Sequence, residues 1–530
     1  MLRDSGSRGV ISPSEAIRLA GTLLVYCVGL MVTIACIRGI WFDEIWSMWA
    51  SGHDIPLKEI IEQRWLKDVH PPLFYALNWI LEPITGLSIQ ERRLENIGAL
   101  AIFLLSAYAL AREAPGILKF LVIFVVLYIT NTYSINYFGE YRSYFIQSCL
   151  FSICLITMYS ISARGADFNR KNDIFPAVIL FVSMIISLNI HYIGTFIAGI
   201  SIGAFLLDQI RMRHWRWSFL IVFAGLISAI PLLSLYWLES RFIGATAAEF
   251  WADTSFPRAL RIIGSVVRES ALGNIVAAVC GGAVVLGLWR KPTENQGDEQ
   301  PESRVPWSFV LAMATALTIA SAALLAVNQV RPIVVDRYLI NMTPIVSIIV
   351  AAAATAPLWS SRLVFAAFLI NGAITATVVS APEIRTQRWY DTARYIRTQI
   401  KACPTAQVYA LAPGTQGSQR LEVNTFGYRL VAGYFGFPIK VIRSSDTSAL
   451  KVSHECPTLF WGEAMADIDV KTLADAPFAR GLSGAGLKDA PMHRDDTGFV
   501  LALPPQSLTA GLRLSARLPA APRRPTGETR

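Results

Sequence analysis

The chain has 530 residues, of which 53% are hydrophobic and only 16% are charged, and its mean hydropathy is +0.44. A soluble protein of this length would divide into several domains and carry more charge. Repeated apolar runs of about 20 residues instead predict a polytopic membrane protein. The net charge of +9 fits Lys and Arg in cytoplasmic loops beside anionic lipid. We find no long basic run with interleaved aromatics, so we expect no nucleic-acid partner.

The N-terminus carries Arg3, Arg8 and Arg18 and has no clear small-residue cleavage site. We therefore expect an uncleaved first helix rather than a removed signal peptide. The apolar runs predict about eleven spans, at about 19–40, 95–112, 117–136, 143–163, 175–190, 193–209, 217–238, 270–289, 306–327, 338–357 and 362–380.

The topology depends on whether residues 71–87 cross the membrane. This stretch is short, opens with two prolines and contains Asn78, Glu82 and Pro83, so we expect an interfacial or re-entrant helix. With this assignment the basic short loops, such as RMRHWRW at 211–217, all face the cytoplasm. The N-terminus is then inside and the C-terminus outside, in a multi-pass membrane protein.

The first outer loop, residues 41–82, is charged yet rich in Trp and Tyr, which favour the membrane interface. Asp43 and Glu44 stand at its start and predict a general base with a helper carboxylate. Alternatively, Asp43 caps an interfacial helix and Glu44 is solvated. His70, before two prolines, is a candidate ligand for phosphate or sugar, or else an ordinary residue at a helix start.

Later outer segments supply further candidates. Glu140, Arg142 and Tyr144 lie in YFGEYRSY (137–144), where the charged pair either serves a site or forms an interfacial ion pair. His191 falls between two apolar runs and either faces a cavity or is a satisfied loop histidine. The remaining candidates are arginines that could grip an anionic phosphate or contact lipid, with one neighbouring tyrosine: Arg241, Arg337 and Tyr338.

The composition changes at about residue 381. We expect an amphipathic helix over Arg385–Gln399, then strand-like runs at 407–412, near 430–442, at 457–461 and at 498–503, which together predict a small α/β domain. Cys403 and Cys456 could form a disulfide if this domain is extracytoplasmic. The predicted domains are therefore 1–380, 381–514 and a disordered tail at 515–530.

These segments, in this order, resemble the GT-C glycosyltransferases. The resemblance is strongest to the branch of protein O-mannosyltransferases, lipid A aminoarabinose transferase and Rgt-type lipopolysaccharide-core enzymes. It rests on FDEIWS (42–47), DVHPPLFYALNW (68–79), RRLEN (92–96), FGEYRSY (138–144), HYIG (191–194), DRYLIN (336–341) and RWYDTARYI (388–396). It covers roughly residues 20 to 400, although Ser143 stands where the family has a proline.

The resemblance implies an α-helical polytopic GT-C fold, with interfacial helices in the first outer loop and a small extracytoplasmic α/β domain. It also implies transfer of a sugar from a polyprenyl-phosphate donor to a glycan, lipid or protein acceptor on the outer face, with Asp43 matching the catalytic carboxylate. No cofactor is required, although a divalent metal could sit beside the two carboxylates.

The alternative function is a lipid-linked-sugar transporter or lipid-binding membrane protein without catalysis. Transporters tend to place charges near the middle of the membrane in broken helices and often contain inverted repeats. Here the carboxylates lie at an expected outer surface and no repeat is visible, so the pattern favours the enzyme.

Overall fold

The computed structural model describes residues 10–68, 70–86, 88–165, 168, 170–246, 255–289, 305–412, 419–443, 453, 455–463, 491–495 and 498–505. The chain divides into two compact units. The helical unit comprises Met1–Arg38 and Trp46–Thr386, and the C-terminal unit comprises Gly39–Ile45 and Gln387–Arg530. The domain limits expected from the sequence stay predictions, and the tail at 515–530 and the polar tract at 291–304 lie outside the described residues.

The helical unit begins with α1 (Pro13–Ile37) and the short helices of the first loop. These are α2 (Phe42–Ala50), whose first residues belong to the C-terminal unit, α3 (Leu57–Ile60), the π-helix η1 (Ile61–Trp65), α4 (Leu73–Thr85) and α5 (Ile89–Arg93). The helices that follow are α6 (Glu95–Glu113), η2 (Pro115–Ile117), α7 (Leu118–Ile129), α8 (Thr132–Phe138), α9 (Ser143–Arg164), α10 (Arg170–Ser187), α11 (Tyr192–Arg211), α12 (Trp215–Thr246), α13 (Phe256–Leu272), α14 (Ile275–Val285), α15 (Trp307–Val330), η4 (Asp336–Leu339), α16 (Met342–Ser360) and α17 (Arg362–Arg385).

Eight helices in the described part are long and apolar enough to cross a membrane, or up to 10 if each of two bent helix pairs is one span. The protein is therefore a multi-pass membrane protein. The sequence predicted about eleven spans. One of these is α10, whose apolar part, Asp173–Ser187, is shorter than the helices counted here, and two others are the bent pairs. The helix α4 is not among the candidates, which agrees with the prediction that 71–87 does not cross.

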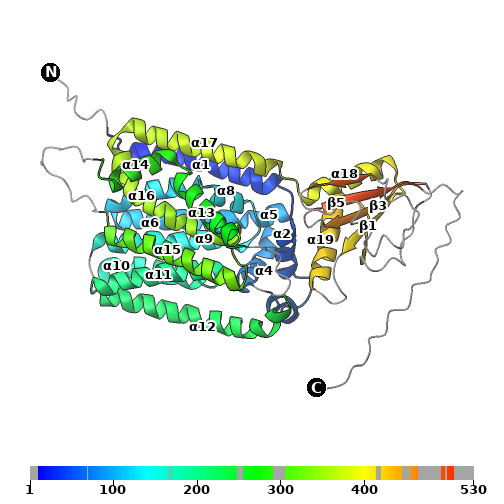
Figure 1. Cartoon of the computed structure of the whole chain (residues 1–530), viewed down its shortest axis with the longest axis horizontal. Helices are drawn as coiled ribbons and strands as arrows, with labels where there is room; N and C mark the ends of the chain where they lie inside the picture. The colour runs from blue at the N-terminus through cyan, green and yellow to red at the C-terminus, as the bar shows by residue number, and fades with distance from the viewer. Residues whose placement is uncertain are drawn as a thin grey trace. The chain divides into compact units, whose positions relative to one another are not determined.

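The long helices run side by side, with α1 against α17 and α10 against α9 and α12 (Figure 1). The centre of the bundle is formed by α9 and α16. In these helices 83% and 78% of the residues of an apolar 18-residue stretch are buried. By contrast, α12 exposes Phe219, Leu226 and Ile230. A water-soluble protein would not leave such a continuous apolar surface uncovered, so this face of α12 is suited to lipid.

Two apolar runs that the sequence predicted as single spans are bent. The pair α7 and α8 turns by 60° at Thr130–Asn131, and α13 and α14 turn by 91° at Gly273–Asn274. In each corner an asparagine caps the second helix: Asn131 accepts from the N–H of Tyr133 at 2.9 Å and Asn274 from the N–H of Ala277 at 3.2 Å. The predicted span 270–289 therefore contains a corner, and the bent pair α13 and α14 counts as a span only if the two helices are taken together.

The connectors at one end of the bundle are basic and held together. Arg362 pairs with Glu15 at 3.3 Å, Ser308 donates to Asp208 at 3.3 Å, and Arg216 donates to the carbonyl of Phe168 at 3.1 Å. Each contact joins two segments that the sequence assigned to the cytoplasm, so the two members of each pair lie together, as that assignment requires.

In the residues of the C-terminal unit that the structure describes, a five-stranded mixed sheet is accompanied by two helices. The elements are α18 (Trp389–Ala402), β1 (Gln407–Ala412), α19 (Gln419–Phe435), β2 (Lys440–Arg443), β3 (Thr458–Glu463), β4 (Met492–Arg494) and β5 (Gly498–Leu503). The strand order is β2-β1-β3-β5-β4, and β1 runs parallel to both β2 and β3. This confirms a small α/β domain, although the predicted run at 430–442 is helical up to Phe435.

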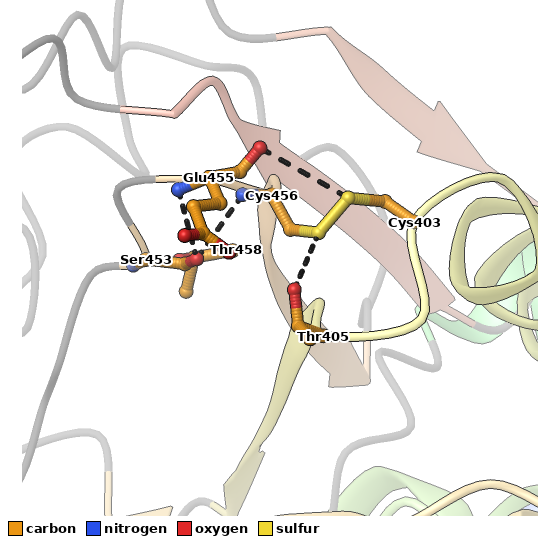
Figure 2. Close-up of a disulfide and its surroundings, with 6 residues drawn as sticks. All are labelled: Cys403, Thr405, Ser453, Glu455, Cys456 and Thr458. Carbon is orange, nitrogen blue, oxygen red and sulfur yellow. Dashed lines mark hydrogen bonds between the residues drawn. A yellow bond between two sulfur atoms is a disulfide. The ribbon is translucent and has the colours of Figure 1, made fainter.

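Cys403 and Cys456 form a disulfide with their Cα atoms 5.8 Å apart (Figure 2). The Thr405 hydroxyl lies 2.9 Å from the Cys456 sulfur, and the Ser453 hydroxyl accepts from the N–H of Cys456 at 3.1 Å. The bond joins the segment after α18 to the segment before β3, which the sequence could only suggest.

Candidate functional site

Four connectors of the helical unit bring aromatic and imidazole rings together. The His191 ring lies 5.3 Å from His70, 5.3 Å from Tyr144 and 5.1 Å from Tyr338, measured between ring centroids. His70 comes from the first loop, Tyr144 from the first turn of α9, His191 from the start of α11, and Tyr338 from η4, which precedes α16. We call them, with Arg142 and Arg337, the ring cluster. The structure therefore brings together four residues that the sequence singled out separately.

Helix starts fix the cluster. His191 is the N-cap of α11, and its Nδ1 accepts from the N–H of Gly194 at 3.3 Å. Gln147, one turn into α9, donates to the carbonyl of His191 at 3.1 Å. Because the side chain caps its own helix and the backbone is tied to α9, the imidazole has a set direction.

Arg142 precedes α9 in an extended conformation and is buried. Its guanidinium donates to the Ser47 hydroxyl at 2.9 Å and to the Tyr144 hydroxyl at 3.4 Å, and lies 3.5 Å from Nε2 of His70. Arg337, in η4, stacks over Tyr338 at 5.5 Å. Arg142 and Arg337 are cations of the kind that hold a phosphate through charged hydrogen bonds.

Sequence reasoning missed Asp68, which is buried beside the cluster. Its carboxylate accepts from the indole N–H of Trp46 at 3.2 Å and from the Tyr75 hydroxyl, and lies 3.3 Å from Nδ1 of His70. Burial by itself raises the pKa of Asp68, but His70, Tyr75 and Arg142 outweigh burial and hold it below its ordinary value. Asp68 is thus an anion that orients His70; the signal was its place two residues before that histidine.

The imidazole of His191 is kept neutral. Burial lowers its pKa well below the ordinary value, and the neighbouring His70, Arg142 and Arg337 lower it further. A neutral ring matches its role as a cap, because Nδ1 must keep a lone pair to accept from Gly194.

Glu140 contacts Arg142 through the main chain, where the Glu140 carbonyl accepts from the N–H of Arg142 at 3.0 Å. Its carboxylate forms a buried ion pair with Arg38 at 2.7 Å, and Arg38 also approaches Glu383 of α17 at 3.2 Å. The arrangement joins the ends of α1, α8 and α17. The structure therefore gives Glu140 a bridging contact, and its predicted role in substrate binding stays a prediction.

Asp43 and Glu44 lie in the first turn of α2. The Glu44 carboxylate accepts from the N–H of Trp41 at 3.4 Å. One turn after Asp43 on the same helix comes Ser47, the hydroxyl that Arg142 contacts. The residues up to Ile45 group with the C-terminal unit and those from Trp46 with the helical unit.

Two predictions receive no direct answer. Arg241 lies within α12, but its side chain is outside the described residues. Among the residues that the structure describes, no group of three or more His, Cys, Asp or Glu is arranged to hold a metal ion. A divalent metal beside Asp43 and Glu44 stays a prediction.

No protein-family model and no curated protein sequence matches the chain. Among solved structures, it is similar to ArnT from Cupriavidus metallidurans bound to undecaprenyl phosphate. The TM-score is 0.50 at 12% identity, over 92% of this chain and 98% of that one. The apo structure of the same protein matches at TM-score 0.43 and 12% identity, over 91% and 97% of the two chains.

The chain has the GT-C fold. The fold expected from the sequence is thus confirmed over nearly the whole chain. Four of the segments that carried the resemblance, at 68–79, 138–144, 191–194 and 336–341, also supply the residues of the ring cluster. These four motifs of the GT-C resemblance are therefore neighbours in space.

Proposed function

We propose that this protein is a membrane glycosyltransferase that moves a sugar from a polyprenyl-phosphate donor to an acceptor hydroxyl. The observation that carries the proposal is the ring cluster, in which buried Arg142 and Arg337 stand beside His70 and His191 at one end of a GT-C bundle. The similar ArnT structure is described as bound to undecaprenyl phosphate, a ligand whose head group requires such cations.

In the proposed reaction, Asp43 accepts the proton of the acceptor hydroxyl as its oxygen attacks the anomeric carbon. The bond between that carbon and the phosphate oxygen breaks, and the polyprenyl phosphate leaves with the electron pair. Arg142 and Arg337 stabilise the charge on the leaving phosphate. A single displacement inverts the anomeric centre, and Glu44 assists Asp43 as the second carboxylate.

We place the site on the extracytoplasmic face of the inner membrane. The Cys403–Cys456 disulfide supports this placement, because disulfides persist in oxidising compartments. The basic connectors at the opposite end of the bundle also support it, since Lys and Arg favour the cytoplasmic side. A lipid-linked donor on that face requires no nucleotide.

Mass spectrometry of envelope lipids, glycans and proteins tests the proposal. Cells that lack the chain should lose one sugar from an acceptor and accumulate the polyprenyl-phosphate sugar donor, and complementation should reverse both changes. If the chain were a transporter without catalysis, cells that lack it would keep the lipid-linked sugar on the inner leaflet. In that case the Asp43→Asn variant would restore the sugar on the acceptor as fully as the wild-type chain does.

A further inference from the structure

The segment Gly39–Ile45, which carries Asp43 and Glu44, belongs to the C-terminal unit, although the rest of that unit begins only at Gln387. The Ile40 carbonyl accepts from the N–H of Trp389 at 3.4 Å, at the start of α18. The Arg388 guanidinium lies 4.8 Å above the Trp41 ring, and Arg420 of α19 lies 6.0 Å from the Phe42 ring. Main-chain and side-chain contacts therefore both tie the start of α2 to α18 and α19.

A glycine in α19 makes room for Ile45. A Cβ atom added at Gly427 would lie 2.7 Å from Cγ2 and 2.9 Å from Cδ1 of Ile45, and 3.3 Å from the Trp389 ring. Separations under about 3 Å are repulsive, so one side chain would have to move. Ile45 is β-branched and stiff at χ1, and Trp389 is packed against Tyr428 and Trp461 at 5.0 and 5.7 Å. The strain would therefore pass to the backbone of Ile45.

A second close approach lies where the chain enters the segment. A Cβ atom at Gly39 would lie 1.6 Å from the carbonyl oxygen of Gln387. Arg388, which follows Gln387, has a backbone φ of +49°, a value that residues other than glycine rarely adopt. The two backbones thus touch at a point where only glycine fits, and this contact fixes the segment at its other end.

We propose that Gly427 and Gly39 are positioning residues, through which the C-terminal unit sets the place and direction of Asp43 and Glu44. The proposal rests on the proposed function, because it assigns Asp43 to catalysis. Asp43 stands two residues before Ile45 in the same helical turn. A displacement of the Ile45 backbone therefore moves the Asp43 carboxylate as well. A misplacement of about 1 Å in a catalytic group can cost about 100-fold in rate.

The test compares Gly427→Ala with Gly433→Ala in the full-length protein. Both changes replace a glycine of α19 by alanine, but a Cβ at Gly433 meets nothing within 4 Å, so helix propensity changes alike and only the contact differs. Gly427→Ala should lower sugar transfer, read by mass spectrometry of complemented cells, by about 10- to 100-fold. It should leave the binding of undecaprenyl phosphate to the purified protein unchanged, and Gly433→Ala should alter neither.

Amide hydrogen exchange gives a readout that does not depend on activity. Gly427→Ala should raise exchange at Glu44 and Ile45, whose N–H groups bond the Trp41 carbonyl at 3.1 Å. Adding Ile45→Ala removes both clashing atoms, and should restore protection and most of the transfer. If Gly427→Ala matches Gly433→Ala in exchange and transfer while Asp43→Asn abolishes transfer, the positioning role is wrong. If Asp43→Asn transfers normally, the proposed function itself fails, whatever the exchange shows.

Discussion

At the scale of single residues, the ring cluster shows what sequence spacing can and cannot give. The charged pair in YFGEYRSY drew attention to Glu140 and Arg142, but their partners are Arg38 and Ser47, which precede them by about a hundred residues. Partners this distant leave no local pattern. Asp68 was overlooked although His70 and Tyr75 lie only two and seven residues after it, because sequence spacing alone does not show that both side chains turn towards the carboxylate.

Arg142 is expected to hold the donor phosphate. Arg142→Lys keeps the charge but loses the planar fork that reaches Ser47 and Tyr144 together. We expect the dissociation constant for undecaprenyl phosphate, measured by titration of the purified protein, to rise about tenfold or more, the equivalent of one lost charged hydrogen bond. Arg397→Gln, on an exposed position of α18, is the control and should bind as the wild type does. Equal binding by both variants would remove Arg142 from the donor site.

His191 predicts a pH dependence of stability. Its pKa is lowered in the folded protein, so below about pH 6.5 the unfolded chain binds more protons than the folded one. Stability is therefore full above that pH and falls as the pH drops towards the lowered value. The thermal midpoint in detergent should decrease from pH 7.5 to 5.5, and His191→Asn, which keeps a capping acceptor, should flatten this decrease. An unchanged slope in the variant would contradict the assignment.

At the scale of elements, hydropathy located the helices but not their bends. The run at 270–289 is apolar apart from Ser270 and Asn274, and apolar composition carries no information about the direction of the chain. The corner comes from Gly273 and from Asn274, which caps α14 and donates to the Phe368 carbonyl at 2.9 Å. A Gly-Asn pair is a usual sign of a turn. In the sequence analysis, the apolar residues on both sides of this pair favoured a continuous span over a turn.

Asn274→Ala should destabilise the corner between α13 and α14. It removes a helix cap and a buried hydrogen bond to α17, with an expected cost of about 1–3 kcal/mol. The midpoint of thermal unfolding in detergent should fall. Gly282→Ala, in α14 with no atom within 4 Å of the added Cβ, should not lower it. A corner that tolerates both changes equally would show that the cap is dispensable.

At the scale of the whole molecule, the sequence predicted the fold class because apolar runs and basic loops follow from the bilayer alone. It could not predict that residues 39–45 group with the C-terminal unit. That grouping depends on contacts with Gly427, Trp389 and Gln387. These residues follow more than 300 positions later, and no local sequence pattern indicates which distant residues will pack together.

The proposed topology predicts which surfaces a membrane-impermeant maleimide can reach. In spheroplasts of cells making a protein with its five free cysteines replaced, Arg397→Cys should react at once. Arg211→Cys, at the end of α11 with its side chain 64% exposed, should react only after the membrane is opened. The reverse pattern would place the C-terminal unit in the cytoplasm and overturn the proposed location.

The most direct test of the proposed chemistry is the rate of sugar transfer by wild-type protein and Asp43→Asn in proteoliposomes supplied with lipid-linked sugars from cells that lack the chain. A missing general base should lower the rate by about 10²- to 10⁴-fold, while undecaprenyl phosphate still binds with unchanged affinity. An Asp43→Asn protein that transfers sugar at the wild-type rate would contradict the account.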